Sequence, residues 1–170
     1  MRSAVHPGPV TDIEPATLEH LDALLAGGGA FEARFGLRVV PGYLAFPEAL
    51  QPARRALIEG IPPEWSSHLI IDPAAGELVG LGGFKGPPRD GEVEIGYSIA
   101  PERQRRGHAT SAARQLIERA RAAGVGLVCA HTLPEAGAST RVLERCGMAR
   151  AGETADPQEG PVWRWEIRLS

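Results

Sequence analysis

Two groups of residues between positions 92 and 109 have types and a spacing suited to chemistry. The first is a glutamate, Glu94, which shares one face of an alternating segment with Gly96 and Ser98. Their small side chains leave room above them, so a carboxylate at this point can line a cleft. The second is a basic turn with a glycine, residues 104–109, which leads into a helical pattern. Main-chain N–H groups at such a turn can hold a pyrophosphate.

A strand and a helix must position these groups, and the hydrophobic periodicity predicts both. Residues 92–99 alternate with the period of a β-strand, and Pro101 ends the strand because proline has no N–H to donate. From Gly107 onward, apolar residues recur at steps of three and four, the pattern of an amphipathic helix. The helix N-terminus attracts an anion, and Gly107 lets a phosphate approach the backbone closely.

Other elements are expected on both sides of this segment. The sequence predicts helices at residues 16–26, 48–59 and 134–146, a hairpin of residues 69–71 and 78–84, a strand at residues 125–131 and a terminal strand at residues 163–169. The first helix is expected to stop at the glycines that begin with Gly27. Residues 31–47 have mixed periodicity, and residues 155–161 are expected to form a polar loop between the last two strands.

The basic turn is part of a wider resemblance to a known family. Residues 104–109, with the sequence Gln-Arg-Arg-Gly-His-Ala, resemble the Q/R-x-x-G-x-G/A element of the GNAT N-acetyltransferases, which also follows a strand. Residues 94–97, Glu-Ile-Gly-Tyr, are similar to the variant in the branch that acetylates the N-termini of ribosomal proteins. Residues 132–148 resemble the family's P-E-N-x-A-S…V-L-E-K-x-G-F ending. The resemblance extends over roughly residues 69–169.

The resemblance implies a fold and a cosubstrate. The fold is the α/β GNAT acyl-CoA N-acyltransferase fold, a mixed, mostly antiparallel sheet flanked by helices, in which strands 92–99 and 125–131 run parallel and splay apart. Acetyl-CoA enters the wedge between them, with its pantetheine arm along the first strand and its pyrophosphate on the basic turn. The residues implied for this binding are Tyr97, Ser98, Ile99, Gln104, Arg105, Arg106, Gly107, His108, Ala109 and Thr110.

The resemblance also implies direct acetyl transfer to a primary amine, on a small molecule or a protein N-terminus. An amine is mostly protonated at neutral pH and must lose a proton before it attacks. Glu94 is the candidate catalytic base, although it can instead bind the amine electrostatically or pair with an arginine. Ser139 is the other candidate catalytic residue, as a proton donor or CoA contact, with a helix cap as its alternative role. Two positions depart from the family: Ala136 replaces an asparagine, and Leu143 replaces a tyrosine general acid.

Functions from two other classes stay open. A non-catalytic acyl-CoA-binding or sensing module would keep the turn, while Glu94 would be dispensable. Nucleic-acid binding would use the arginines of the turn and the following helix, although a net charge of −3 and a pI near 6.0 are unlike those of a general polyanion binder. These arginines are Arg103, Arg105, Arg106 and Arg114.

The length and composition indicate one domain, residues 1–170, in an ordinary globular protein. No early segment resembles a secretory signal, and no apolar run reaches the ~20 residues that span a bilayer. We therefore expect a cytoplasmic monomer or homodimer with no nucleic-acid or membrane partner. Cys129 and Cys146 have no metal-ligand spacing, so we expect free thiols and no metal.

Several other charged residues can be weighed in the same way. His131 ends its predicted strand and can orient a substrate, but packing or solvent exposure is the more common role of such a residue. His68 has a similar balance of roles. Lys85 is the only lysine, which we attribute to genome composition. Acidic residues expected in loops can rim an amine site; they are Glu32, Glu153, Asp156 and Glu159.

Overall fold

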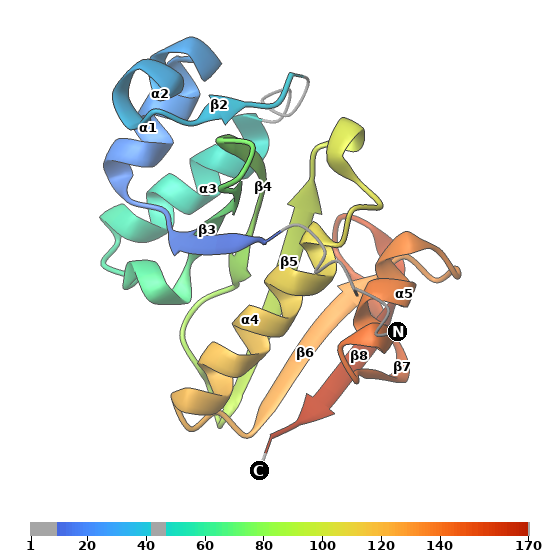
Figure 1. The fold of residues 1–170 in the computed structure, drawn as a ribbon. Coiled ribbons are helices and arrows are strands. Elements are labelled where there is room, and N and C mark those ends of the chain that lie inside the picture. Colours follow the sequence, from blue (N-terminus) through green and yellow to red (C-terminus); the bar gives the residue numbers. More distant parts are fainter. Residues whose placement is uncertain (1–9, 42–46, 170) are drawn as a thin grey trace, which may run out of the picture.

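A single sheet runs through the described part of the chain, and helices pack on both of its faces (Figure 1). The computed structural model describes residues 10–41 and 47–169. The strands are β1 (Asp12–Pro15), β2 (Arg38–Val39), β3 (Ser67–Asp72), β4 (Glu77–Phe84), β5 (Glu92–Ile99), β6 (Leu127–Thr132), β7 (Ala149–Asp156) and β8 (Gly160–Arg168). The α-helices are α1 (Leu18–Ala26), α2 (Gly28–Phe35), α3 (Pro47–Ile58), α4 (His108–Ala122) and α5 (Ala138–Arg145).

The sheet is mixed and mostly antiparallel, as expected. Its strand order is β1-β3-β4-β5-β6-β8-β7, and β2 pairs with β4 outside this path. Only two of the pairings found among the described strands are parallel, β5 with β6 and β2 with β4. The predicted hairpin of β3 and β4 is confirmed, and so is the parallel neighbour of β5.

The parallel strands β5 and β6 separate after a short paired stretch. They pair only from Glu92 opposite Leu127 to Glu94 opposite Cys129. Beyond that point β5 continues along β4 as far as Ile99, whereas β6 continues along β8. The predicted splay is therefore confirmed, and it begins directly after Glu94.

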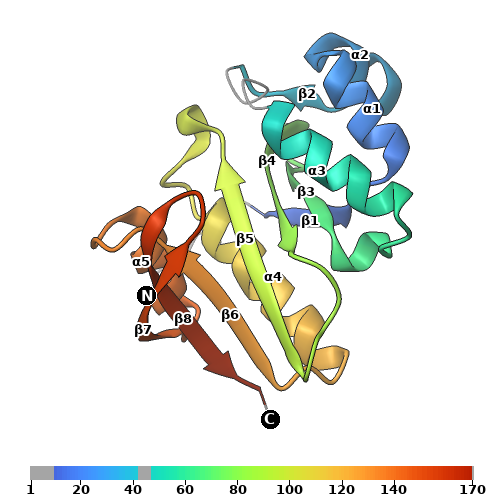
Figure 2. The same cartoon turned by 180° about the vertical axis from the view of Figure 1, so that it is seen from behind.

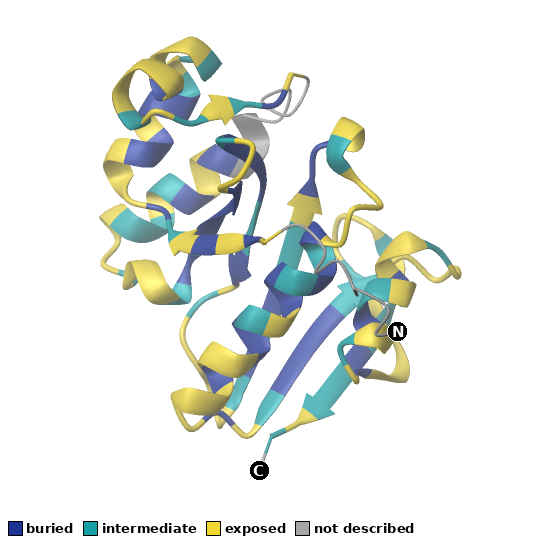
Figure 3. Ribbon diagram, viewed as in Figure 1, coloured by how far each residue is buried: buried dark blue, intermediate teal, exposed yellow. Residues whose placement is uncertain are grey.

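The alternation of β3 and β4 places two hydrophobic cores on opposite sheet faces. Leu69, Ile71 and Leu78 pack with residues of α1, α2 and α3, whereas Ile70 and Val79 pack with α4. Figure 2 shows this arrangement from behind, with α3 on the near side of the sheet and α4 on the far side. The face of α4 that packs on the sheet is buried together with β4 and β6, while the outer faces of the helices are exposed (Figure 3).

Helix α2 and strand β1 are elements that the sequence analysis did not predict. Gly27, with φ 127°, turns the chain out of α1, and α2 then begins within the glycine run that was expected to be a stop. Phe31 is fully buried, and its ring centroid lies 5.0 Å from that of Phe35. Burial of Phe31 and its contact with the partly buried Phe35 outweigh the poor helix propensity of the glycines. Strand β1 is short, and side chains of α4 hydrogen-bond to the backbone carbonyls of Thr11 and Ile13.

Two predicted boundaries were also wrong. Helix α5 starts at Ala138, later than expected, because the Gly137 amide donates to Thr140 Oγ1 at 2.9 Å and fixes the first turn there. Strand β7 extends to Asp156, so the expected loop of residues 155–161 shortens to a turn. Part of the irregular segment 31–47 and the first residues, to which the expectation about a secretory signal refers, lie outside the described residues. Among the residues described, no helix is long and apolar enough to cross a bilayer.

Candidate active site

The basic turn has the backbone shape of an anion site. Arg105 has φ 65° and Gly107 has φ 89°, so the turn contains two left-handed residues, a feature of main-chain anion sites. The first hydrogen bond of α4 runs from Ser111 N to Gly107 O at 3.0 Å. The amides of residues 108–110 precede that bond and have no partner inside the helix. The turn joins β5 through Gln104, whose Nε2 donates to the carbonyl of Ile99 at 3.1 Å.

The His108 ring anchors this turn to the sheet. It is almost fully buried, its Nδ1 lies 2.9 Å from Thr11 Oγ1, and its Nε2 lies 3.7 Å from Asp72. Burial lowers the pKa of His108, with the nearby Asp72 carboxylate opposing the shift. The ring therefore has a structural role, and His108 can contact a ligand through its main chain.

A cavity of about 550 Å³, here called the turn cavity, lies between this turn, the end of β5 and the start of α5. Every residue that the sequence analysis proposed for cofactor binding lines the turn cavity except Arg106. Arg141 and Arg145 also line it, and sequence analysis missed both. Their spacing of four residues on a helix face was the signal available.

Arg103 lines the turn cavity and is held from below by a buried carboxylate. Arg103 Nε and Nη2 donate to Glu77 at 3.0 Å each, and Arg38 also pairs with Glu77. These hydrogen bonds lower the pKa of Glu77 from 4.5 to about 2, with the Arg103 contact contributing most. The arginines that line the turn cavity, Arg103, Arg105, Arg141 and Arg145, give it a local positive charge although the chain is acidic overall.

A second cavity, of about 670 Å³ and here called the strand cavity, lies over β4, β5 and β6. Three glycines are among the residues that line it: Gly82, Gly83 and Gly96. A Cβ on Gly82 would lie 2.8 Å from the carbonyl oxygen of Gly96, so β4 and β5 approach too closely there for another residue. The strand cavity and the turn cavity share Tyr97, Ser98 and Ser139. The two spaces therefore meet where β5 leaves β6.

Glu94 lies beside the strand cavity and has two partners on the same oxygen. Lys85 Nζ is 2.7 Å from Glu94 Oε2, and His131 Nδ1 is 3.2 Å from it. Lys85 and His131 both line the strand cavity, whereas Glu94 is not one of the lining residues. His131 is partly buried and contacts Glu94 at the edge of the strand cavity, and Lys85 has a place in the site that composition could not indicate. In the alternative role Glu94 would pair with an arginine, whereas its partners in the structure are Lys85 and His131.

Tyr97 and Ser139 connect the two sides of the splay. Tyr97 Oη donates to the carbonyl of Ser139 at 3.2 Å, so the phenol bridges β5 and α5. Burial raises the pKa of Tyr97, and the phenol stays protonated. Ser139 is the second residue of α5, and the helix cap is Gly137, so the alternative role of Ser139 as a cap was wrong. Leu143 is buried and lines the strand cavity, and its aliphatic side chain can act as neither acid nor base.

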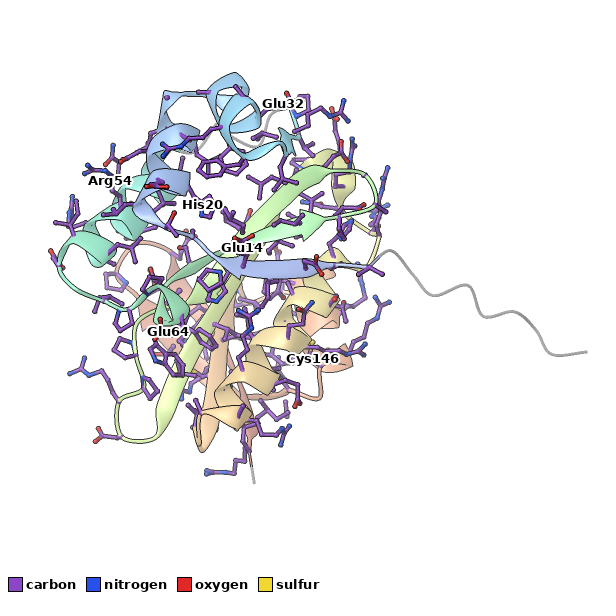
Figure 4. All side chains as sticks on the ribbon, turned by 60° about the vertical axis from the view of Figure 1, so that its left-hand side comes forward. Glu14, His20, Glu32, Arg54, Glu64 and Cys146 are labelled. Atoms are coloured by element: carbon purple, nitrogen blue, oxygen red, sulfur yellow. The ribbon has the colours of Figure 1, made fainter. Side chains whose placement is uncertain are left out.

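The remaining sequence candidates divide between the site and the periphery. Glu159 lines the strand cavity, and Asp156 Oδ1 accepts from the amides of residues 158 and 159, which shapes the turn that carries it. Glu32 lies on α2, well away from Cys146 at the end of α5 (Figure 4). Cys146 Sγ is 3.7 Å from the carbonyl oxygen of Thr110, and burial raises its pKa, so the thiol is not an activated nucleophile.

Comparisons with known proteins agree with this geometry. A family model described as an acetyltransferase (GNAT) domain matches residues 13–149. A comparison with curated proteins found no significant match. Among solved structures, RimJ from Mycobacterium smegmatis in complex with CoA-disulfide has 19% identity and a TM-score of 0.67, with 95% of this chain and 84% of that chain covered.

Two further solved structures have the names of ribosomal-protein acetyltransferases. The ribosomal-protein-S5-alanine acetyltransferase from Vibrio fischeri has 12% identity and a TM-score of 0.64, with 94% of this chain and 93% of that chain covered. RimL, a ribosomal L7/L12 α-N-protein acetyltransferase in complex with coenzyme A, has 16% identity and a TM-score of 0.67, with 94% of each chain covered. At these identities the likeness shows the fold, and the family model adds the match in sequence. The chain belongs to the GNAT acetyltransferase family.

Proposed function

We propose that this protein transfers an acetyl group from acetyl-CoA to a primary amine by direct attack of the amine. The observation that supports this most strongly is the meeting of the turn cavity and the strand cavity at Tyr97, Ser98 and Ser139. One cavity suits a phosphate-containing donor and the other suits an acceptor. Two reactants held in adjoining cavities react without the entropic cost of a chance encounter.

The residues around the turn cavity fit coenzyme A. Main-chain amides of the basic turn, residues 104–109, hold the pyrophosphate, and Arg141 and Arg145 add positive charge beside it. The end of β5, residues 97–99, binds the pantetheine arm through main-chain groups, because β6 no longer pairs with it there. Bound acetyl-CoA supplies an activated thioester whose thiolate is a good leaving group.

Glu94 and His131 remove the proton from the acceptor amine. His131 lines the strand cavity and contacts Glu94, so it can pass a proton from the amine to the carboxylate. An acceptor must also displace Lys85 from Glu94 Oε2. Backbone N–H groups around Ser98 and Ile99 stabilise negative charge on the acyl oxygen. Ser139, which lines both cavities, returns a proton to the thiolate.

The acceptor is proposed to be a small-molecule amine or a protein N-terminus. The names of RimL and the S5-alanine acetyltransferase favour the N-terminus, and the strand cavity, at about 670 Å³, has room for a short extended peptide. We further propose that residues 1–170 form one catalytic domain that works in the cytoplasm as a monomer or homodimer.

Thiol release from acetyl-CoA with a panel of amines and short peptides tests the function. We expect turnover by the unaltered protein and a loss on the order of 10²–10⁴-fold in the Glu94→Gln variant. Glu153→Gln is the matched control, because Glu153 is an exposed carboxylate on β7 that lines neither cavity. Equal turnover by both variants would refute the role of Glu94. Tight binding of coenzyme A with no turnover on any acceptor would instead support the sensing module.

A further inference from the structure

The side-chain amine of Lys85 is placed as an acceptor amine would be. Phe84 pairs with Ile95 at the end of the β4–β5 ladder, so Lys85 comes next, opposite Glu94. The Lys85 amide donates to the Glu94 carbonyl at 2.9 Å, and Lys85 Nζ lies 2.7 Å from Glu94 Oε2. The chain thus brings a primary alkyl amine to its own candidate base.

A glycine on β5 makes room for this lysine. A Cβ built on Gly96 would lie 3.6 Å from Lys85 Cε, so the aliphatic stem of Lys85 passes over Gly96. Gly96 is two residues from Glu94 in one direction and two residues from Ser98 in the other. Lys85 and Ser98 line the strand cavity together, and Ser98 also lines the turn cavity. The amine therefore lies in the same space that a thioester bound beside Ser98 would enter.

The ion pair with Glu94 does not lock the amine in place. The Lys85 side chain is 63% exposed and that of Glu94 is 25% exposed. Pairs with an exposed partner of this kind contribute at most about 1 kcal/mol, so the amine leaves the carboxylate readily. His131 remains against the same carboxylate oxygen and keeps the base in position when Lys85 moves.

The geometry points to Lys85 as an internal acetyl acceptor, modified by the molecule that carries it. This inference rests on the proposed function, since it uses the same acetyl donor and the same base. The Lys85 ammonium gives one proton to Glu94, and its nitrogen lone pair forms a bond to the acyl carbon of acetyl-CoA. The carbon–sulfur bond breaks, and its electron pair leaves on the sulfur of coenzyme A. The nitrogen then loses a second proton, so the products are acetyl-lysine, the free thiol of coenzyme A and one proton.

Acetylation would change the charge of the strand cavity. An acetylated Lys85 is neutral and cannot pair with Glu94, so the cation that competes with external amines for this carboxylate is removed. Because Lys85 is the only lysine of the chain, its modification can be followed without interference from other lysines.

The test is incubation of the full chain with acetyl-CoA and no acceptor, followed by intact mass and peptide mapping. Arg121→Lys supplies a reference lysine on an exposed part of α4 that lines neither cavity. We expect acetylation of Lys85 to be on the order of 10²-fold faster than that of the reference lysine, with a rate that does not depend on protein concentration. Glu94→Gln should reduce the Lys85 rate to that of the reference, and Lys85→Arg should abolish thiol release without acceptor.

Equal rates at the two lysines would overturn the inference, and so would a rate per molecule that rises with protein concentration. Thiol release with the amine panel, measured on the same preparations, separates this failure from failure of the proposed function. Turnover of external amines with an unmodified Lys85 would remove the inference and leave the function intact. The absence of thiol release together with the absence of coenzyme A binding by calorimetry would remove both.

Discussion

Replacement of Glu77 by glutamine tests the ionic contacts beneath the turn cavity. The Glu77 side chain is 4% exposed, and it pairs with Arg103, which lines the cavity, and with Arg38. Its pKa is lowered from 4.5 to about 2, chiefly by the hydrogen bonds from Arg103. The variant keeps the shape of the side chain and removes the charge, so two guanidinium groups lose their common partner.

The magnitude follows from that pKa. At 1.36 kcal/mol for each pKa unit, the ionised Glu77 contributes about 3 kcal/mol to the free energy of unfolding. Because the pKa is lower in the folded state than in the unfolded state, this stabilisation is complete above pH 4.5 and is lost as the pH falls toward 2. The free energy of unfolding of the Glu77→Gln variant should therefore be lower by about 3 kcal/mol at pH 7, which lowers the Tm by about 6–12 °C for a chain of this size.

Urea unfolding of both proteins at pH 7 and pH 3 measures the effect. The difference between the unaltered protein and the variant should shrink by at least about half at pH 3, because Glu77 is then protonated in the unfolded chain but still mostly ionised in the folded protein. Glu102→Gln is the control, because Glu102 also faces Arg103, at 3.9 Å, but is 64% exposed. A loss of the same size at both pH values, or an equal loss in the control, would refute the argument.

Three further predictions concern buried and left-handed positions. Gly80→Ala should lower the free energy of unfolding in urea by roughly 1–3 kcal/mol, because a Cβ there would lie 2.3 Å from a carbonyl oxygen of β5. Gly29→Ala should not destabilise the protein, because a Cβ on Gly29 would have no atom within 4 Å. An equal loss in both variants would contradict the packing argument. Burial lowers the pKa of His68 from 6.5 to about 4. The contribution of His68 to the free energy of unfolding should therefore be constant above pH 6.5 and fall by about 3 kcal/mol as the pH decreases to 4. A His68→Gln variant with the same pH dependence would exclude His68 as the cause. Gly107→Ala should weaken coenzyme A binding about tenfold in calorimetry, because a residue other than glycine at φ 89° adds strain of about 1–2 kcal/mol and reshapes the turn. Arg106→Ala, at a residue that does not line the turn cavity, should have a smaller effect. The reverse order would show that side chains, and not main-chain amides, bind the coenzyme.

The sequence alone determined the local elements around the site. The strand of residues 92–99 has the bounds that its alternation predicted, and helix α4 begins next to the predicted Gly107. Both patterns depend on neighbours within a few residues, where the backbone period fixes which side chains share a face. Glu94 and the basic turn could be proposed for the same reason. The resemblance of residues 104–109 and 132–148 added the splayed sheet, which the strand pairing confirms.

Only the tertiary structure decided which residues gather around Glu94. Lys85 reaches it through the register of β4 on β5, and His131 through the parallel pairing that sets Cys129 opposite Glu94. Register between strands that are distant in sequence is set by packing of whole faces, and no local pattern records it. Helix α2 also formed against the propensity of its glycines, because the buried Phe31 stabilises it through contacts made only in the folded chain.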